Sequence, residues 1–280
     1  MPEFHVEVVD VSSCAAQLLT QPSGLSKQQV KQAMKKGAVW VSENGSNHKR
    51  LRRADKYLKL GQTIHLYYDP KVLEAQVTPA VLIKHEGDYS IWYKPYGMLS
   101  QGTKWGDHCT INRWVEQNQK PQRPAFIVNR LDRAAQGLML IAHTKAAAAG
   151  LSRLFEQRKI IKTYTALVEG LFPETLVLNT PIDELGAISR ASLLTYDSSA
   201  KQSLVSVSIE TGRKHQIRKH LSGAGFAIIG DRLYGSKEAD GDVDLCLVST
   251  YLEFICPLTQ VEKSYRLTDA YLPKLARLHD

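Results

Sequence analysis

The sequence predicts an α+β protein in two parts, a small N-terminal α/β module over residues 1–75 and a larger domain over residues 76–280. Three observations predict this arrangement. Strand-like segments recur from residue 81 to residue 250, only two stretches there have a helical pattern, and a proline-containing stretch separates them from the N-terminus. Because runs of strands with few intervening helices do not build βαβ units, the larger domain should contain a mixed, mostly antiparallel sheet.

The N-terminal module contains a predicted helix over residues 26–37. Ser26 can cap its N-terminus, and Gly37 is placed to end it. Apolar and cationic side chains fall on different faces of this helix, with Val30, Ala33 and Met34 on one face and Lys27, Lys31 and Lys35 on the other. Beyond the helix we expect strands at residues 38–41 and 63–68, a turn at 43–46 and a linker at 69–80.

The larger domain contains eight predicted strands and two predicted helices. Thr144 is placed to cap the first helix, over residues 144–159, and the second, over residues 213–225, ends in glycines. The strands are expected at residues 81–86, 89–95, 125–128, 138–143, 161–170, 191–196, 203–210 and 245–250.

The formal net charge of +8 comes from one segment of the chain. Residues 27–59 contain ten basic and two acidic residues, whereas the remainder contains 26 of each sign. Such a concentrated cationic patch favours a nucleic-acid partner, because binding to phosphates releases counterions; the alternative is a solvated helix face. The candidate phosphate contacts in this segment are Lys27, Lys31, Lys35, Arg50, Arg52 and Arg53.

Composition excludes several other classes of protein. No apolar run is long enough to span a bilayer, and the N-terminus lacks the pattern of a signal peptide, so we expect a cytoplasmic protein without a membrane partner. The four cysteines, Cys14, Cys109, Cys246 and Cys256, are widely separated. This spacing predicts reduced thiols and no metal site.

The segment "NRLDRAAQG", residues 129–137, places one carboxylate between two apolar runs. Asp132 is flanked by Arg130 and Arg133, whose charges favour its ionised form. An ionised carboxylate can serve as a nucleophile or a base, but not as a general acid. The alternative is a structural ion pair in a turn, and the segment alone does not distinguish the two.

Two further segments combine charge, glycine and strand boundaries, "KTYTALVEG" at residues 162–170 and "TGRKHQIRKHLSGAG" at residues 211–225. Within them, Tyr164 is either a core aromatic or a stacking platform. Arg213 and Arg218 belong either to a solvated basic face or to a phosphate or carboxylate clamp.

In combination, order and spacing these segments resemble the RluA-type pseudouridine synthase family. The stretch "NRLDRAAQGLML" keeps the arginine, leucine, aspartate, glycine and leucines of that family's central motif, and residues 211–235 are similar to its third motif. Upstream, "YKPYGMLSQ" resembles its lysine-proline-x-glycine motif. The resemblance covers residues 80–270 and implies a pseudouridine synthase fold. Residues 12–68 resemble an S4-like RNA-binding domain.

The resemblance also implies roles for individual residues. Asp132 would be the reacting carboxylate, Tyr164 would lie beside the target base, and Arg218 would pair with Asp132. Arg130 would enter the base stack that a flipped uridine vacates. The other candidate RNA contacts of this domain are Lys162, Arg213 and Lys214. The isomerisation transfers no external group and is redox-neutral, so no cofactor is expected.

Three positions depart from the family pattern, Asn129 for histidine, Ala135 for threonine and Gln136 for serine. They leave open a catalytically inactive RNA-binding or ribosome-assembly factor of the same fold. A glycoside or nucleoside hydrolase is disfavoured, because it needs two carboxylates and these loops offer one. The expected substrate is large-subunit ribosomal RNA, with transfer RNA as the alternative, and a monomer is the default oligomeric state.

Overall fold

The computed structural model describes residues 2–43, 46–235 and 243–275, which form two compact units. The first contains Met1–Val77 and Gln101–Asn118, and the second contains Thr78–Ser100 and Gln119–Asp280. The sequence predicts a division between residues 75 and 76, close to the first of these boundaries. It assigns residues 101–118 to the larger domain, whereas their contacts place them in the first unit.

The first unit is a four-stranded antiparallel sheet with helices. Its strands lie in the order β1-β4-β2-β3, and the apolar sides of the two longer helices pack on the sheet around Leu19, Met34 and Ile64. The strands are β1 (Glu3–Glu7), β2 (Val39–Glu43), β3 (Ser46–Arg50) and β4 (Gln62–Tyr67). The helices are α1 (Ala15–Ser23), α2 (Lys27–Lys35), α3 (Pro70–Glu74) and α4 (Ile111–Asn118).

Helix α2 confirms the predicted helix and its cap. The Ser26 hydroxyl accepts a hydrogen bond from the Gln29 amide (3.2 Å), and the Gln29 side chain accepts one from the Ser26 amide (2.9 Å). The predicted apolar residues Val30, Ala33 and Met34 are all buried. The predicted turn at 43–46 includes residues 44 and 45, which lie outside the described residues, and the expected linker contains α3.

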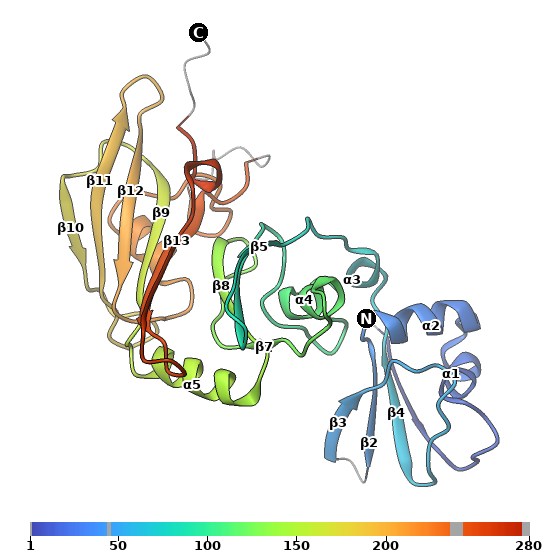
Figure 1. Ribbon diagram of the computed structural model, residues 1–280. Helices are drawn as coiled ribbons and strands as arrows, with labels where there is room; N and C mark the ends of the chain where they lie inside the picture. Colours follow the sequence, from blue (N-terminus) through green and yellow to red (C-terminus); the bar gives the residue numbers. More distant parts are fainter. Residues whose placement is uncertain (1, 44–45, 236–242, 276–280) are drawn as a thin grey trace. The chain divides into compact units, whose positions relative to one another are not determined.

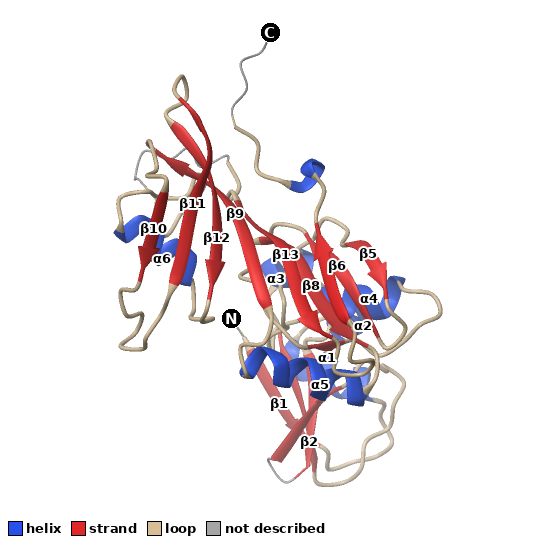
Figure 2. Cartoon of the chain, turned by 60° about the vertical axis from the view of Figure 1, so that its left-hand side comes forward, coloured by secondary structure: helices blue, strands red, loops and turns tan. Residues whose placement is uncertain are grey.

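The second unit is built on one ten-stranded sheet, and it confirms the mixed, mostly antiparallel prediction (Figures 1 and 2). The strand order is β10-β11-β12-β9-β13-β8-β6-β5, with β14 paired to β13 and β7 to β8; β8 and β13 form the parallel pair. The strands are β5 (Val81–His85), β6 (Tyr89–Lys94), β7 (Phe126–Ile127), β8 (Gln136–Ala142), β9 (Ile161–Glu169), β10 (Thr175–Leu178), β11 (Ser189–Asp197), β12 (Gln202–Ile209), β13 (Leu247–Ile255) and β14 (Glu262–Arg266).

Both helices predicted in this unit are present. Helix α5 (Lys145–Glu156) begins at Thr144, whose hydroxyl accepts a hydrogen bond from the Ala147 amide, and packs on β7 and β8. Helix α6 (Gln216–Gly223) contacts β11 (Figure 2). A single turn of 3-10 helix, Asp269–Tyr271, follows β14.

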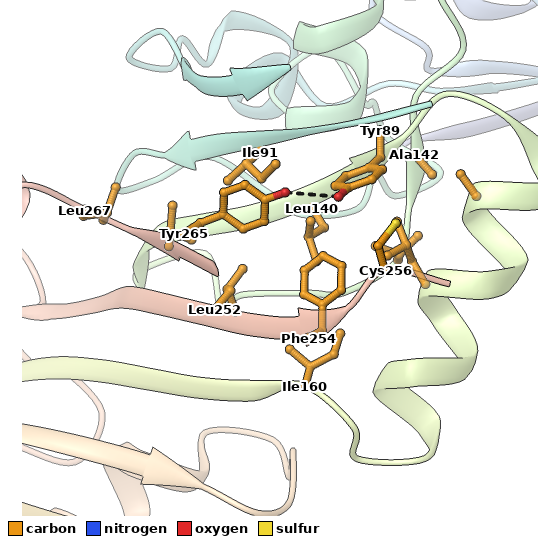
Figure 3. Close-up of a cluster of buried hydrophobic side chains, with 14 of the residues drawn as sticks. Tyr89, Ile91, Leu140, Ala142, Ile160, Leu252, Phe254, Cys256, Tyr265 and Leu267 are labelled. Carbon is orange, nitrogen blue, oxygen red and sulfur yellow. Dashed lines mark hydrogen bonds between the residues drawn. The ribbon is translucent and has the colours of Figure 1, made fainter. Parts of the chain in front are cut away.

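The core of the second unit joins residues that are far apart in the sequence. Leu140 of β8, Leu252 and Phe254 of β13 and the side chain of Tyr89 pack together (Figure 3). The hydroxyl groups of Tyr89 and Tyr265 share a hydrogen bond of 3.0 Å inside this apolar cluster. This packing anchors β8 and β13 at the centre of the sheet, and the loop that carries Asp132 leads directly into β8.

Candidate active site

Asp132 lies in the loop between β7 and β8, and residues 94–100 hold this loop in place. The Ser100 hydroxyl donates to the Leu131 carbonyl (2.6 Å) and accepts from the Leu131 amide (3.0 Å). The Gly97 amide donates to the Arg133 carbonyl (2.9 Å). The side chain of Asp132 is 31% exposed. Because hydrogen bonds fix the backbone of both its neighbours, the Asp132 carboxylate is held in a defined position.

Lys94 is a fully buried lysine beneath the same loop. Its ammonium donates to the carbonyls of Met98 (2.9 Å), Pro95 (3.1 Å) and Arg133 (3.4 Å). Burial lowers the pKa of Lys94 to about 7, against the opposing attraction of the Asp132 carboxylate. Lys94 therefore ties residues 95–98 to the Asp132 loop and adds a positive charge near the carboxylate when it is protonated.

The start of β8 approaches β13 so closely that only glycine fits there. A Cβ at Gly137 would lie 2.3 Å from the Ser249 carbonyl oxygen, and the residue has a φ of +115°. On the other side of β13, Tyr164 of β9 pairs with Ser249. Close packing of these strands therefore brings the Asp132 loop and Tyr164 to one place.

Tyr164 is buried and lies near Asp132. Burial, with a smaller contribution from the Asp132 charge, raises the pKa of Tyr164 well above its ordinary value of 10.0, although a hydrogen bond with Ser249 opposes this shift. Its phenol is therefore protonated at neutral pH. A protonated aromatic side chain can pack against a base and donate a hydrogen bond, but it is a poor proton acceptor.

Arg218 of α6 contacts two aspartates, one buried and one partly exposed. Its Nε and Nη2 donate to the two carboxylate oxygens of Asp231 at 2.8 and 2.6 Å. Its Nη1 lies 3.8 Å from Oδ2 of Asp132. The resemblance predicts Asp132 as the partner of Arg218; the structure brings the two together, but the bidentate partner is Asp231.

Burial disfavours the charged forms of Arg218 and Asp231, whereas the hydrogen bonds between the two side chains stabilise those charged forms. Burial alone would lower the pKa of Arg218, but the hydrogen bonds and charge of Asp231, with the Asp132 charge, raise it above its usual range. Burial likewise opposes ionisation of Asp231, but the Arg218 hydrogen bond and two backbone amides lower the pKa of Asp231. The guanidinium is therefore charged and held in one orientation beside Asp132.

His215 is a second side chain that lies beside Asp132. Its Nε2 lies 3.8 Å from Oδ2 of Asp132, and its Nδ1 is 2.9 Å from the Tyr234 hydroxyl. His215 precedes α6 with a φ of +56°. This is a left-handed backbone conformation that residues other than glycine seldom adopt. Burial lowers its pKa, and the Asp132 charge opposes that shift.

Two hollows meet at Asp132. One is a cavity of about 410 Å³, and its lining includes Tyr96, Arg133, Arg232 and Leu233. The other, of about 100 Å³, has Arg130, Tyr164 and Arg213 in its lining. Asp132, His215 and Arg218 line both hollows. The carboxylate is thus open to a ligand, while its arginine partner is buried.

The remaining candidate RNA contacts differ in their surroundings. Arg130 is exposed and Arg213 is partly buried, and both line the smaller hollow; Lys214 is exposed next to His215. Lys162 is half-buried, with its ammonium 5.9 Å from the centre of the Phe155 ring, and it lines neither hollow.

In the first unit, the six candidate contacts fall into two groups. Arg50 and Arg52 both contact the Asp107 carboxylate, and Arg50 also stacks at 4.2 Å over the Trp40 ring. The other four, Lys27, Lys31, Lys35 and Arg53, are exposed. Of the six candidates, Arg50 and Arg52 therefore form ion pairs within the first unit, and the other four are exposed to solvent.

The three departures from the family pattern make structural contacts. The Asn129 side-chain oxygen accepts from the Leu140 amide (3.1 Å), and the Gln136 side-chain oxygen accepts from the Tyr93 hydroxyl (2.6 Å). Ala135 is buried. The Asn129 and Gln136 side chains therefore tie the two ends of the loop to β8 and β6.

Comparison with known families matches residues 88–223 to the RNA pseudouridylate synthase family. This match spans the Asp132 loop, Tyr164 and Arg218. The chain belongs to the RNA pseudouridine synthase family. Membership confirms the RluA-type resemblance, and it makes the protein an isomerase acting on RNA.

Relatives of this synthase are found among curated proteins and solved structures. It is 28% identical over 76% of its length to an uncharacterised RNA pseudouridine synthase of Aquifex aeolicus, covering 74% of that protein. It is 27% identical over 81% of its length to ribosomal large subunit pseudouridine synthase D of Buchnera aphidicola, covering 82%. The fold of human RNA pseudouridylate synthase domain containing 1 is similar, with a TM-score of 0.59 and 20% identity over 69% of this chain and 85% of that chain.

The sequence alone predicts no role for Asp231, His215 or the Lys94 ammonium. All three lie inside the segments that carry the resemblance, but their roles depend on contacts made in the folded synthase. In the described part of the chain, no cluster of three or more histidine, cysteine or acidic residues could hold a metal ion, and no helix could span a bilayer.

The buried Arg218–Asp231 pair leads to a first prediction. Asp231→Asn keeps the shape of the side chain but leaves the guanidinium without its full counter-charge. The free energy of unfolding should fall by about 3 kcal/mol, and turnover should fall with it because Arg218 loses its fixed position beside Asp132. Urea unfolding and a turnover assay measure the two effects.

Asp183→Asn is the matched control, because Asp183 forms an exposed ion pair with Lys219 (2.8 Å) and asparagine tolerates its left-handed backbone. This control should leave stability and turnover unchanged. Equal behaviour of the two variants would contradict the role given to Asp231.

A second prediction concerns pH. The pKa of Lys94 is near 10.5 in the unfolded chain and about 7 in the folded protein, so between these values the unfolded chain binds more protons. The free energy of unfolding should therefore increase from pH 7 to pH 10, by at most about 1.4 kcal/mol per pH unit. Urea unfolding at several pH values should show this slope in the native protein and a flatter one in Lys94→Met. Lys84→Met, at an exposed lysine, is the control and should keep the native slope.

Proposed function

We propose that this synthase isomerises a uridine in structured large-subunit ribosomal RNA, with Asp132 as the reacting carboxylate. The observation that carries the proposal is the position of Asp132, partly exposed between two hollows and 3.8 Å from the buried Arg218 guanidinium. The names of relatives support the substrate, since large-subunit synthases C and D are among them.

The chemistry requires the bond from uracil N1 to ribose C1′ to break and a bond from uracil C5 to C1′ to form. Asp132 can attack C1′ as the N1 bond breaks, or remove the proton from C2′ to give a glycal and free uracil. In the first route C5 displaces the carboxylate from C1′, and in the second C5 bonds to C1′ while C2′ regains its proton from Asp132. In both routes the proton on C5 is then lost. Arg218, with its Nη1 3.8 Å from Oδ2 of Asp132, places a positive charge beside the carboxylate in both routes.

Tyr164 supports the detached base in this proposal. Its ring is buried beside the smaller hollow, where it can pack against uracil while the base turns. Because the Tyr164 phenol is protonated at neutral pH, the proton from C5 passes more readily to Asp132 or to His215. The burial of Arg218 and Tyr164 also limits access of the water that would intercept free uracil.

The first unit serves as an S4-like RNA-binding domain in this proposal. Lys27, Lys31 and Lys35 are exposed along α2, whereas Val30, Ala33 and Met34 of the same helix are buried. They form a row of ammonium groups that a phosphate backbone can follow. All the proposed catalytic groups come from one chain, so a monomer suffices.

Substitution of Asp132 tests the chemistry. Asp132→Asn should lower the release of tritium from [5-³H]uridine in ribosomal RNA by at least about 10²–10⁴-fold, because the amide is neither a nucleophile nor a base. RNA affinity, measured by filter binding, should stay near the native value. Retained turnover would remove Asp132 from this role. If native protein releases tritium from transfer RNA instead, the substrate proposal is wrong and the chemistry stands.

The row of lysines on α2 gives a further prediction. Replacing Lys27, Lys31 and Lys35 together with Gln should weaken RNA binding and reduce the slope of log affinity against log salt by about 2–3, because each lost phosphate contact removes about 0.7–0.9. The control replaces three exposed lysines of the second unit, Lys84, Lys145 and Lys201, with the same loss of charge. An equal slope in the two triple variants would contradict the binding role of α2.

A further inference from the structure

Leu233 is an exposed leucine at the rim of the larger catalytic cavity. It is 66% exposed and lines this cavity together with Asp132 and Arg218. A single exposed leucine on a protein surface is ordinary. This one, however, shares a cavity with the reacting carboxylate of a synthase whose substrate is a polyanion.

The turn that presents Leu233 is built around the buried Asp231. One carboxylate oxygen of Asp231 accepts hydrogen bonds from the amides of Leu233 (3.0 Å) and Tyr234 (3.1 Å). The Asp231 carbonyl accepts from the Gly235 amide (2.8 Å). Since Arg218 holds both carboxylate oxygens of Asp231, the same side chain fixes the catalytic arginine and the position of Leu233.

The two ends of this turn are equally constrained. A Cβ at Gly230 would lie 2.4 Å from the Asp244 carbonyl oxygen, and one at Gly235 would lie 2.3 Å from the Asp231 carbonyl oxygen. The Tyr234 hydroxyl is hydrogen-bonded to His215. These contacts and the hydrogen bonds to Asp231 hold the backbone of the turn, so Leu233 is presented to a ligand at low conformational cost.

The surroundings of Leu233 favour RNA as that ligand. Arg133 and Arg232 line the same cavity, so the leucine stands among cationic groups that suit phosphates. A protein partner would be expected to meet a wider apolar surface than this one side chain. Proteins that distort nucleic acids commonly insert a single apolar side chain at a base step.

We propose that Leu233 is a wedge that packs against the base next to the target uridine and keeps the RNA stack open while the uridine is flipped out. The proposal rests on the proposed reaction at Asp132. It differs from the role of Arg130, which lines the other hollow and offers hydrogen bonds to the unpaired partner base. Leu233 offers an apolar surface, so its contribution should depend on how strongly the target is stacked and paired.

The test compares two hairpins that contain one uridine modified by the native protein. In the first the uridine faces adenine; in the second the adenine is deleted, so that the uridine is bulged. Leu233→Ala should lower kcat/KM, measured by tritium release, by about tenfold or more on the paired hairpin and by less than about threefold on the bulged one. Leu233→Met, which keeps the apolar surface, should restore activity on the paired hairpin.

Leu171→Ala is the matched control, since Leu171 is 63% exposed and lines neither hollow. It should leave both rates unchanged. Equal losses on the two hairpins would assign Leu233 a general structural role and overturn the proposal, as would native rates on both. If the native protein modifies transfer RNA and not ribosomal RNA, the hairpin pair is taken from that transfer RNA. In that case the substrate proposal is wrong, but the comparison of the two hairpins still tests whether Leu233 acts as a wedge.

Discussion

The buried ion pair between Arg218 and Asp231 is the interaction on which the rest of the active site depends. Removing two charges from water is costly, and the pair is stable because each oxygen of Asp231 accepts from the guanidinium and two backbone amides complete its shell. With Asp231 so occupied, the third nitrogen of Arg218 is directed at Asp132. Because the buried Asp231 fixes two nitrogens of Arg218, the third is left to interact with the partly exposed Asp132.

Two features of the fold hold the Asp132 loop in place beside the Arg218–Asp231 pair. Gly137 lets β8 lie against β13, and residues 94–100 hold the Asp132 loop through Ser100, Gly97 and the Lys94 ammonium. The departures at Asn129 and Gln136 follow the same logic. Each accepts a hydrogen bond from a neighbouring group of the sheet, so the loop keeps its support although the family's usual residues are absent.

The sequence predicted the class of sheet, both helices of the second unit and the capped helix α2, because each has a local pattern of its own. It missed several elements, among them α1, which contains Pro22, and the short edge strand β10, whose identity depends on pairing with β11. Asp132, Tyr164 and Arg218 could be found from motif spacing. The partnership of Arg218 with Asp231 could not, because both aspartates carry the same charge and only the fold determines which is buried. The assignment of residues 101–118 to the first unit likewise depends on contacts such as that of Asp107 with Arg52.

The left-handed backbone at His215 shows how strain is concentrated at this site. A φ of +56° costs free energy at a histidine but not at a glycine, so contacts of the histidine side chain must offset that cost. The gain lies in its two contacts, Tyr234 on one side and Asp132 on the other. Tyr234 belongs to the turn that Asp231 fixes. The strained residue thus links the Leu233 turn to Asp132, so a movement of one would be transmitted to the other through the His215 side chain.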